Sequence, residues 1–137
     1  MILQLISVYI GIIGFAIILE VPKNYLPYAG VAGTIGWGAY LLCQEIIPAS
    51  GIFVSSFCVA FLSQIFARKL RCPVTVFLIP GIYPSVPGAG IYRTVYYFIM
   101  GENTLAGNYF LKTLTTAGMI ALGIYIVDIF WKLRKVN

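Results

Sequence analysis

The stretch FLIPGIYPSVPGAGIYRTVYYF, from Phe77 to Phe98, decides how this chain folds. It carries three prolines and three glycines within its first fourteen residues, in a chain that otherwise reads as membrane-spanning helix. Proline removes a backbone donor and clashes with the preceding helical turn, so Pro80, Pro84 and Pro87 cannot all lie inside one regular helix. The stretch therefore predicts an interrupted helix.

The composition places the whole chain in a membrane. Its 137 residues are 61% hydrophobic and only 9% charged, with a mean hydropathy of +0.95. The exposed surface of one small soluble domain does not accommodate such values. A spanning helix needs roughly 20 apolar residues to cross a hydrocarbon core about 30 Å thick. We therefore expect a single transmembrane domain over residues 1–137, an all-α bundle of about five transmembrane helices whose fourth is broken by the Pro/Gly element.

The expected spans follow the apolar runs, with short connections between them. They are Ile2 to Leu19, Tyr28 to Ile47, Gly51 to Ala67, the interrupted region Pro73 to Met100, and Tyr109 to Trp131. The first run lacks the basic start and small-residue cleavage site of a secretory signal, so we expect it to be a helix of the bundle. The polar segment Gly101 to Asn108 is expected to be a turn.

The basic residues predict the orientation. Five crossings place one set of them on the same side of the membrane: Lys23, Arg68, Lys69, Arg71, Lys132, Arg134 and Lys135. Short cytoplasmic loops carry an excess of Lys and Arg, so this side is expected to be cytoplasmic, with the N-terminus outside and the C-terminus inside. The same count indicates that the interrupted region crosses the membrane.

As one straight helix, the interrupted region would be about 42 Å long at about 1.5 Å per residue. We expect instead two half-helices, about Val74 to Ile79 and Ala89 to Met100, joined by irregular chain from Pro80 to Gly88. Irregular backbone is tolerated in the bilayer only where protein buries it or water reaches it. Broken helices of this kind mark substrate sites in secondary transporters. A proline kink that serves packing alone is an equal alternative.

The candidate substrate path follows this segment. Its members are Pro80, Gly81, Pro84, Pro87, Gly88, Ala89, Gly90, Tyr92, Arg93 and Tyr96. The free amides at the start of the second half-helix carry partial positive charge, so they are expected to hold an anionic group. Arg93 has two interpretations: a ligand for a substrate carboxylate, or a cation that reaches the outer headgroups or a partner's acid.

Small residues in the second and third spans predict close helix packing. They are Gly30, Gly33, Thr34, Gly36 and Gly38, together with Ser56 and Ser63. Such faces let helix backbones approach one another, so the second span is expected to lie deep in the bundle. Packing is the favoured role for the serines over lining a polar path.

Catalytic chemistry is not expected. The chain has no histidine, which excludes Ser-His and Cys-His nucleophile pairs and the usual imidazole metal sites. We predict no catalytic residue, no metal and no cofactor, and we interpret the scattered Cys43, Cys58 and Cys72 as small buried hydrophobes. An intramembrane enzyme is therefore a weak hypothesis.

The acidic residues indicate that the chain is incomplete as a pump. Proton-coupled transporters commonly use an intramembrane carboxylate or histidine, but none of Glu20, Glu45, Glu102 and Asp128 falls at mid-membrane. Asp128 is expected to pair with Lys132 at i,i+4. If coupling exists, we expect a partner to carry it.

Two stretches resemble the threonine/serine exporter family, specifically its smaller half, which occurs as a separate short protein or as the C-terminal half of a fused exporter. They are VPKNYLPYAGVAGTIGWGAYLL, starting at Val21, and the Phe77 to Phe98 stretch. The most specific parts are Val21-Pro22 before a helix ending Gly-Trp-Gly, and Pro84-x-x-Pro87-Gly88 followed by Tyr92.

The resemblance implies a small subunit that exports small polar metabolites, hydroxy amino acids or dicarboxylates, across the cell membrane. It also implies a larger multi-pass membrane subunit as partner, with a homo-oligomer as the competing assembly and no nucleic acid. The alternative function is a non-transporting membrane scaffold or assembly protein, in which the glycines and prolines serve packing only.

Overall fold

The computed structural model describes residues 1–47 and 50–136, and its regular elements in those ranges are all helical. The elements are α1 (Ile2–Ile18), the 3₁₀ turn η1 (Lys23–Tyr25), α2 (Leu26–Ile46), α3 (Gly51–Leu70), α4 (Thr75–Ile82), the 3₁₀ turn η2 (Tyr83–Ser85), α5 (Gly88–Ile99) and α6 (Asn103–Val136). The predicted all-α class is therefore confirmed.

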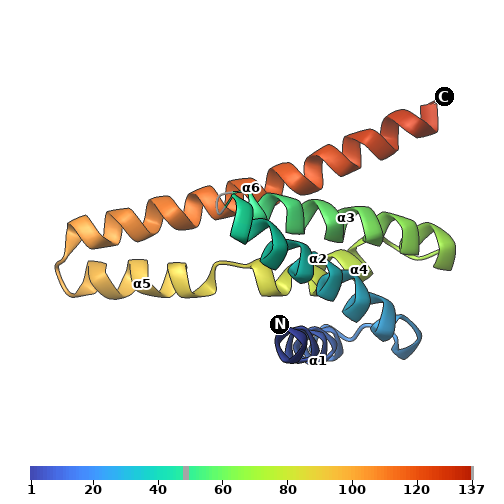
Figure 1. Cartoon of the computed structure of the whole chain (residues 1–137), viewed down its shortest axis with the longest axis horizontal. Helices are drawn as coiled ribbons and strands as arrows, with labels where there is room; N and C mark the ends of the chain where they lie inside the picture. The colour runs from blue at the N-terminus through green and yellow to red at the C-terminus, as the bar shows by residue number, and fades with distance from the viewer. Residues whose placement is uncertain (48–49, 137) are drawn as a thin grey trace.

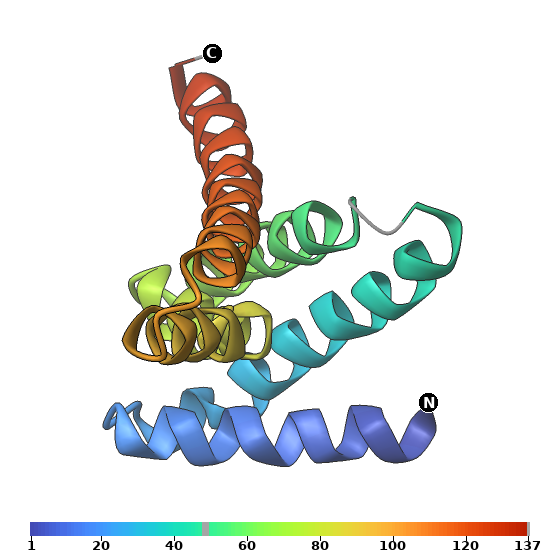
Figure 2. The ribbon, with the colours of Figure 1, turned by 90° about the vertical axis from the view of Figure 1, so that its left-hand side faces the viewer.

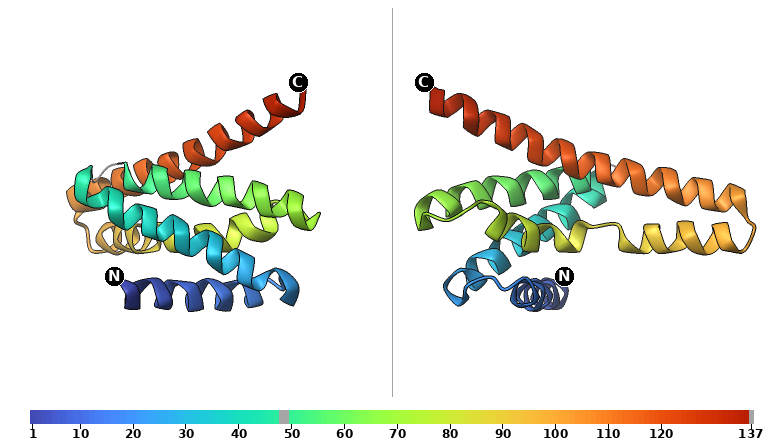
Figure 3. Two further views of the ribbon diagram at one scale, coloured as in Figure 1. Left: turned by 45° about the vertical axis from the view of Figure 1, so that its right-hand side comes forward. Right: turned by 180° about the vertical axis from the view of Figure 1, so that it is seen from behind.

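The helices form a bundle with an arm. Helices α1 to α4 gather together, and α6 runs along α3 before both end in basic residues (Figure 1). Helix α1 crosses the others at a steep angle, with α2 rising from it towards α3 (Figure 2). Helix α5 packs mainly against the first half of α6, and these two segments extend beyond the other helices as a two-helix arm (Figure 3).

Among the residues that the structure describes, two helices, α3 and α6, are long and apolar enough to cross a membrane, while α1 and Thr75–Ser85 are shorter apolar helices. Helix α6 has 34 residues, so it is about 51 Å long and exceeds the thickness of a hydrocarbon core. The ends of α3 and α6 lie together, because the Arg68 guanidinium carbon is 5.0 Å from the centroid of the Trp131 ring.

Helix α2 is the centre of the bundle because its surface is made of small residues. Its buried members are Ala29, Gly30, Ala32, Gly33 and Gly36. A Cβ atom added at Gly30 would lie 2.5 Å from the Tyr9 ring of α1, and one added at Gly36 would lie 3.1 Å from the Ser55 carbonyl oxygen of α3. Neighbouring helices therefore approach the α2 backbone directly.

A close backbone approach joins Gly33 of α2 to Gly81 of α4. A Cβ added at Gly33 would lie 3.0 Å from both the Cα and the carbonyl oxygen of Gly81, and it would also meet the Ile12 side chain of α1. On its other side, a Cβ added at Gly81 would lie 2.7 Å from Val59 of α3. Four helices thus meet around two glycines, neither of which has room for a side chain.

The interruption begins later than the sequence predicts. The expected irregular chain starts at Pro80, but Pro80 is the sixth residue of α4, which continues to Ile82. Proline at this position loses the hydrogen bond to the Val76 carbonyl and crowds that carbonyl. Packing of Gly81 against α2 and α3 offsets this cost, so α4 continues past the proline. The chain then turns through η2 and becomes extended at Val86 (φ −65°, ψ 128°), as expected for a residue before a proline.

The predicted polar turn from Gly101 to Asn108 is wrong. Gly101 ends α5 with a φ of +81°. Its N–H donates to the Phe98 carbonyl at 3.2 Å, and the Glu102 N–H donates to the Tyr97 carbonyl at 3.0 Å. This is a Schellman motif, which reverses the chain within two residues. Helix α6 therefore begins at Asn103, and Ala106 is buried in it.

The Gly33–Gly81 contact predicts an unusual response to alanine. Gly33→Ala places a methyl group against the α4 backbone, so we expect the free energy of unfolding in detergent to fall by about 1–3 kcal/mol. The control is Gly118→Ala in α6, where a Cβ would meet nothing within 4 Å. Because alanine favours helix over glycine, this control is expected to leave stability unchanged or raised. If Gly33→Ala and Gly118→Ala stabilise the protein equally, Gly33 and Gly81 do not lie in close contact.

Candidate functional site

One side of the α4–α5 connection is anchored in the bundle. Pro80, Gly81, Ile82 and Ser85 are buried. The Ser85 hydroxyl lies 3.2 Å from the Ser55 hydroxyl of α3, a buried hydrogen bond between two side chains. The Tyr83 ring stacks on the Phe15 ring of α1, with centroids 4.3 Å apart. Helices α1 and α3 therefore hold the position of η2.

The other side of the connection is open. Val86, Gly88 and Ala89 are exposed, and a Cβ added at Gly88 would meet nothing within 4 Å. The Gly88 N–H donates to the Val86 carbonyl at 2.8 Å, and the first bond of α5 runs from the Ile91 N–H to the Pro87 carbonyl. Among the described residues, the amides of Ala89 and Gly90 have no backbone acceptor. Helix α5 thus presents two free donors beside open space.

The residues of the candidate substrate path lie in different surroundings, some in contacts between helices and others exposed. Gly81 contacts α2 and α3, and a Cβ added at Gly90 would collide with the Thr113 hydroxyl of α6. These two glycines therefore lie in helix contacts. Tyr92 and Tyr96 are exposed on α5, with ring centroids 6.1 Å apart. The structure brings Pro84, Pro87, Gly88 and Ala89 together at the connection, while Tyr92 and Tyr96 lie farther along α5 in the arm.

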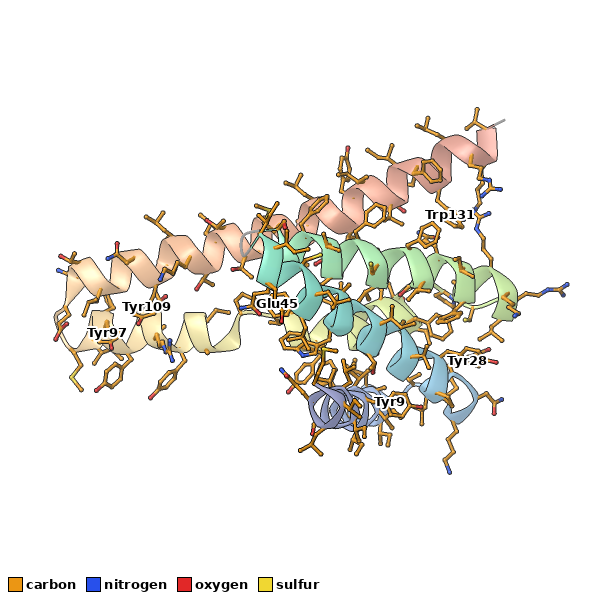
Figure 4. All side chains as sticks on the ribbon, in the orientation of Figure 1. Tyr9, Tyr28, Glu45, Tyr97, Tyr109 and Trp131 are labelled. Carbon is orange, nitrogen blue, oxygen red and sulfur yellow. The ribbon has the colours of Figure 1, made fainter. Side chains whose placement is uncertain are left out.

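Arg93 lies against the arm's aromatic side chains. Its guanidinium carbon is 5.6 Å from the Tyr109 ring centroid, and the Lys112 ammonium is 5.8 Å from the same centroid. Tyr97 stacks on Tyr109 at 5.4 Å, and both rings lie between α5 and α6 (Figure 4). Within the described residues, neither Arg93 nor Lys112 has a carboxylate within 4.0 Å.

Sequence reasoning did not single out Lys112, a second cation that contacts the same Tyr109 ring as Arg93. The available signal was that Lys112 is the single basic residue inside the predicted span from Tyr109 to Trp131. It also missed Gly123, at which an added Cβ would lie 3.0 Å from the Ser56 Cβ and 3.1 Å from the Phe53 carbonyl oxygen. Gly123 is one of three glycines in α6, and added Cβ atoms at the other two, Gly107 and Gly118, would meet nothing within 4 Å, so the sequence does not indicate which of the three makes a helix contact.

The other small residues predicted to pack differ in their contacts. Gly38 is packed less tightly than the other glycines of α2, since an added Cβ would lie 3.7 Å from the Leu5 side chain. The hydroxyls of Thr34 and Ser56 donate to carbonyls of their own helices, those of Gly30 and Ile52. The Ser63 hydroxyl is buried without a hydrogen-bond partner among the described residues.

The acidic residues lie at the surface or in a local pair. Glu20, Glu45 and Glu102 are exposed. The Lys132 ammonium nitrogen lies 2.9 Å from a carboxylate oxygen of Asp128, which confirms the i,i+4 ion pair that the sequence predicts. This hydrogen bond raises the pKa of Lys132 above its ordinary value. No buried carboxylate occurs in the described part of the bundle, and no three His, Cys, Asp or Glu side chains gather there as metal ligands.

The sequence has identifiable relatives. A family profile described as "Threonine/Serine exporter, ThrE" matches residues 4–130. A threonine/serine exporter from Corynebacterium glutamicum is 27% identical over 110 residues. That match covers 80% of this chain but 22% of the relative, so this chain spans only a small part of the relative's length. No solved structure gives a significant match.

The Ser55–Ser85 bond predicts energetic coupling between the connection and α3. In a double-mutant cycle with Ser55→Ala and Ser85→Ala, we expect a coupling energy of about 0.6 kcal/mol, typical of hydrogen bonds between membrane helices. Unfolding of the full chain in detergent measures it. Ser56→Ala combined with Ser85→Ala is the control, because the Ser56 hydroxyl bonds within its own helix. Absence of coupling in the first cycle would show that η2 is not anchored through these hydroxyls.

Proposed function

Because this chain belongs to the threonine/serine exporter family, we propose that it is the smaller subunit of a secondary exporter for small polar metabolites. Hydroxy amino acids are the first candidates, as the name of the Corynebacterium glutamicum relative indicates, and dicarboxylates are the second. The observation that carries the proposal is the α4–α5 connection, which is anchored to the bundle through Ser85 and open at Gly88.

In this proposal the connection is a Pro/Gly break within the bilayer, and the start of α5 binds the substrate carboxylate. The free amides of Ala89 and Gly90 and the positive end of the helix dipole attract an anion without a dedicated side chain. Gly88 leaves room for the substrate to approach the backbone. Arg93, one turn farther along α5, adds positive potential from its place beside Tyr109.

The proposed topology has five crossings, with the N-terminus outside and the C-terminus in the cytoplasm. Helix directions support it. Helix α2 crosses α1 at an angle and runs back towards the start of α1, since Gly30 contacts Tyr9 whereas Gly38, farther along α2, lies near Leu5 (Figure 2). Contacts of Ser56 with Gly123 and of Arg68 with Trp131 make α3 and α6 parallel. The two basic helix ends then share one face, as expected for the cytoplasmic side.

The proposed partner is a larger multi-pass membrane subunit. Transport coupled to an ion commonly requires an intramembrane acid or histidine, and the described bundle contains no buried carboxylate. The matched exporter extends far beyond the segment that resembles this chain. Both observations favour a second subunit that supplies the coupling group.

A non-transporting scaffold is the second candidate function. The contacts of Gly81 and Gly90 with neighbouring helices favour it, because they give these glycines a packing role. On this alternative, the opening at Gly88 has no role in export.

The substitution Gly88→Leu separates the two functions. It fills the open space without meeting a neighbour, so we expect normal insertion and assembly but export about tenfold slower, a loss of about 1.4 kcal/mol. Efflux of serine and threonine is measured in cells that lack both endogenous subunits and express this chain, the larger subunit, or both. Only the pair is expected to export.

Gly107→Leu in α6 is the matched control, because a Cβ at Gly107 also meets nothing within 4 Å. Gly90→Leu is unsuitable, since it would collide with Thr113. Normal export by an assembled Gly88→Leu variant would remove the connection from the substrate path. If Gly88→Leu loses both export and assembly while Gly107→Leu keeps both, the scaffold function is favoured.

A further inference from the structure

The basic ends of α3 and α6 enclose a small cavity. Its volume is about 210 Å³, and its lining includes Arg68 of α3 and Asp128, Trp131, Lys132 and Lys135 of α6. Three cations and one carboxylate therefore face a single space. The predicted orientation places this space at the cytoplasmic headgroup level, where membrane phosphates are concentrated.

The cations of this cavity are only partly neutralised. Asp128 is paired with Lys132 at 2.9 Å, while Arg68 and Lys135 have no carboxylate within 4.0 Å among the described residues. Arg68 is held over the Trp131 ring at 5.0 Å, and Trp131 is only 7% exposed. An arginine supported in this way presents a planar fork of donors that suits a phosphate group.

An apolar cavity lies deeper between the same two helices. It has a volume of about 230 Å³ and is lined by Phe57, Phe61, Ile126, Val127 and Phe130. On α3 its lining lies about two turns nearer the middle of the helix than Arg68. The two cavities are neighbours, because the Phe61 ring packs edge-on against Trp131 with centroids 5.4 Å apart.

We propose that these two cavities form one binding site for an anionic phospholipid. The phosphate binds Arg68, Lys132 and Lys135, and an acyl chain lies against Phe57, Phe61 and Phe130. A free anion would need only the basic cavity. The adjoining apolar cavity suits the acyl chain of a lipid. Basic pockets between transmembrane helices on the cytoplasmic side are suited to anionic headgroups.

Quenching of Trp131 by lipids with brominated chains tests the site. Trp37→Phe leaves Trp131 as the only tryptophan in the sequence, and the Trp37 indole N–H has no hydrogen-bond partner among the described residues. The full chain is placed in phosphatidylcholine vesicles that contain either brominated phosphatidylglycerol or brominated phosphatidylcholine. We expect an apparent affinity about fivefold higher for phosphatidylglycerol, equivalent to about one effective cation near the surface.

Arg68→Gln in this background is expected to abolish the preference. Arg134→Gln is the matched control, since it removes one positive charge from the same helix end outside the cavity lining. Equal quenching by the two lipids in the Trp37→Phe protein would overturn the proposal, whether or not Arg68→Gln folds. If inorganic phosphate, added at matched ionic strength, removes the preference for phosphatidylglycerol, the site binds free anions and the lipid-site proposal is also overturned.

Discussion

The close approach of Gly33 and Gly81 is the contact on which the rest of the structure depends. Helix α4 has eight residues, too few for a stable isolated helix, so packing must hold it in place. The absence of side chains at the two glycines lets α4 lie directly on α2. One turn earlier, Phe77 is fully buried and packs edge-on against the rings of Tyr25 and Phe66. Together these contacts position η2 and the open connection after it.

This arrangement shows how a proline-rich segment is accommodated among apolar helices. The backbone of α4 is covered by α2 and α3, and the Ser85 hydroxyl finds a partner in Ser55. Polar groups exposed to hydrocarbon without partners would be costly. The far side of the connection, at Val86, Gly88 and Ala89, is exposed, and in the proposed exporter that is the side that faces the substrate.

Much of the fold follows from local sequence. The two differences have separate causes, a contact between distant helices at Gly81 and a local helix cap at Gly101. Apolar runs predict α1 and α3 closely, because each helix is one uninterrupted apolar segment. Proline content alone places the end of the first half-helix at Ile79, but burial of Gly81 extends α4 to Ile82. Composition suggests a turn up to Asn108, whereas the Schellman motif at Gly101 completes the reversal in two residues.

The location of the candidate site could be predicted from the sequence, but the surroundings of its individual residues could not. The sequence indicates which segment is irregular, but spacing does not say which glycine faces a helix and which faces open space. The structure distinguishes Gly81 and Gly90, which lie in contacts, from Gly88, which does not. The contact of Arg93 with Tyr109 depends on how α5 and α6 pack, so no pattern within either helix reveals it.

If the connection at Gly88 lines the substrate path, a cysteine placed there reacts with reagents in water and is protected by bound substrate. In a chain whose three native cysteines are replaced by serine, Gly88→Cys is assembled with the larger subunit and treated with a small water-soluble thiol reagent. We expect transported serine or threonine to slow the modification about tenfold, with no slowing at a Gly107→Cys control. If, in an exporter that still transports, the cysteine at position 88 stays unreactive or reacts at the same rate with and without substrate, the connection does not line the substrate path.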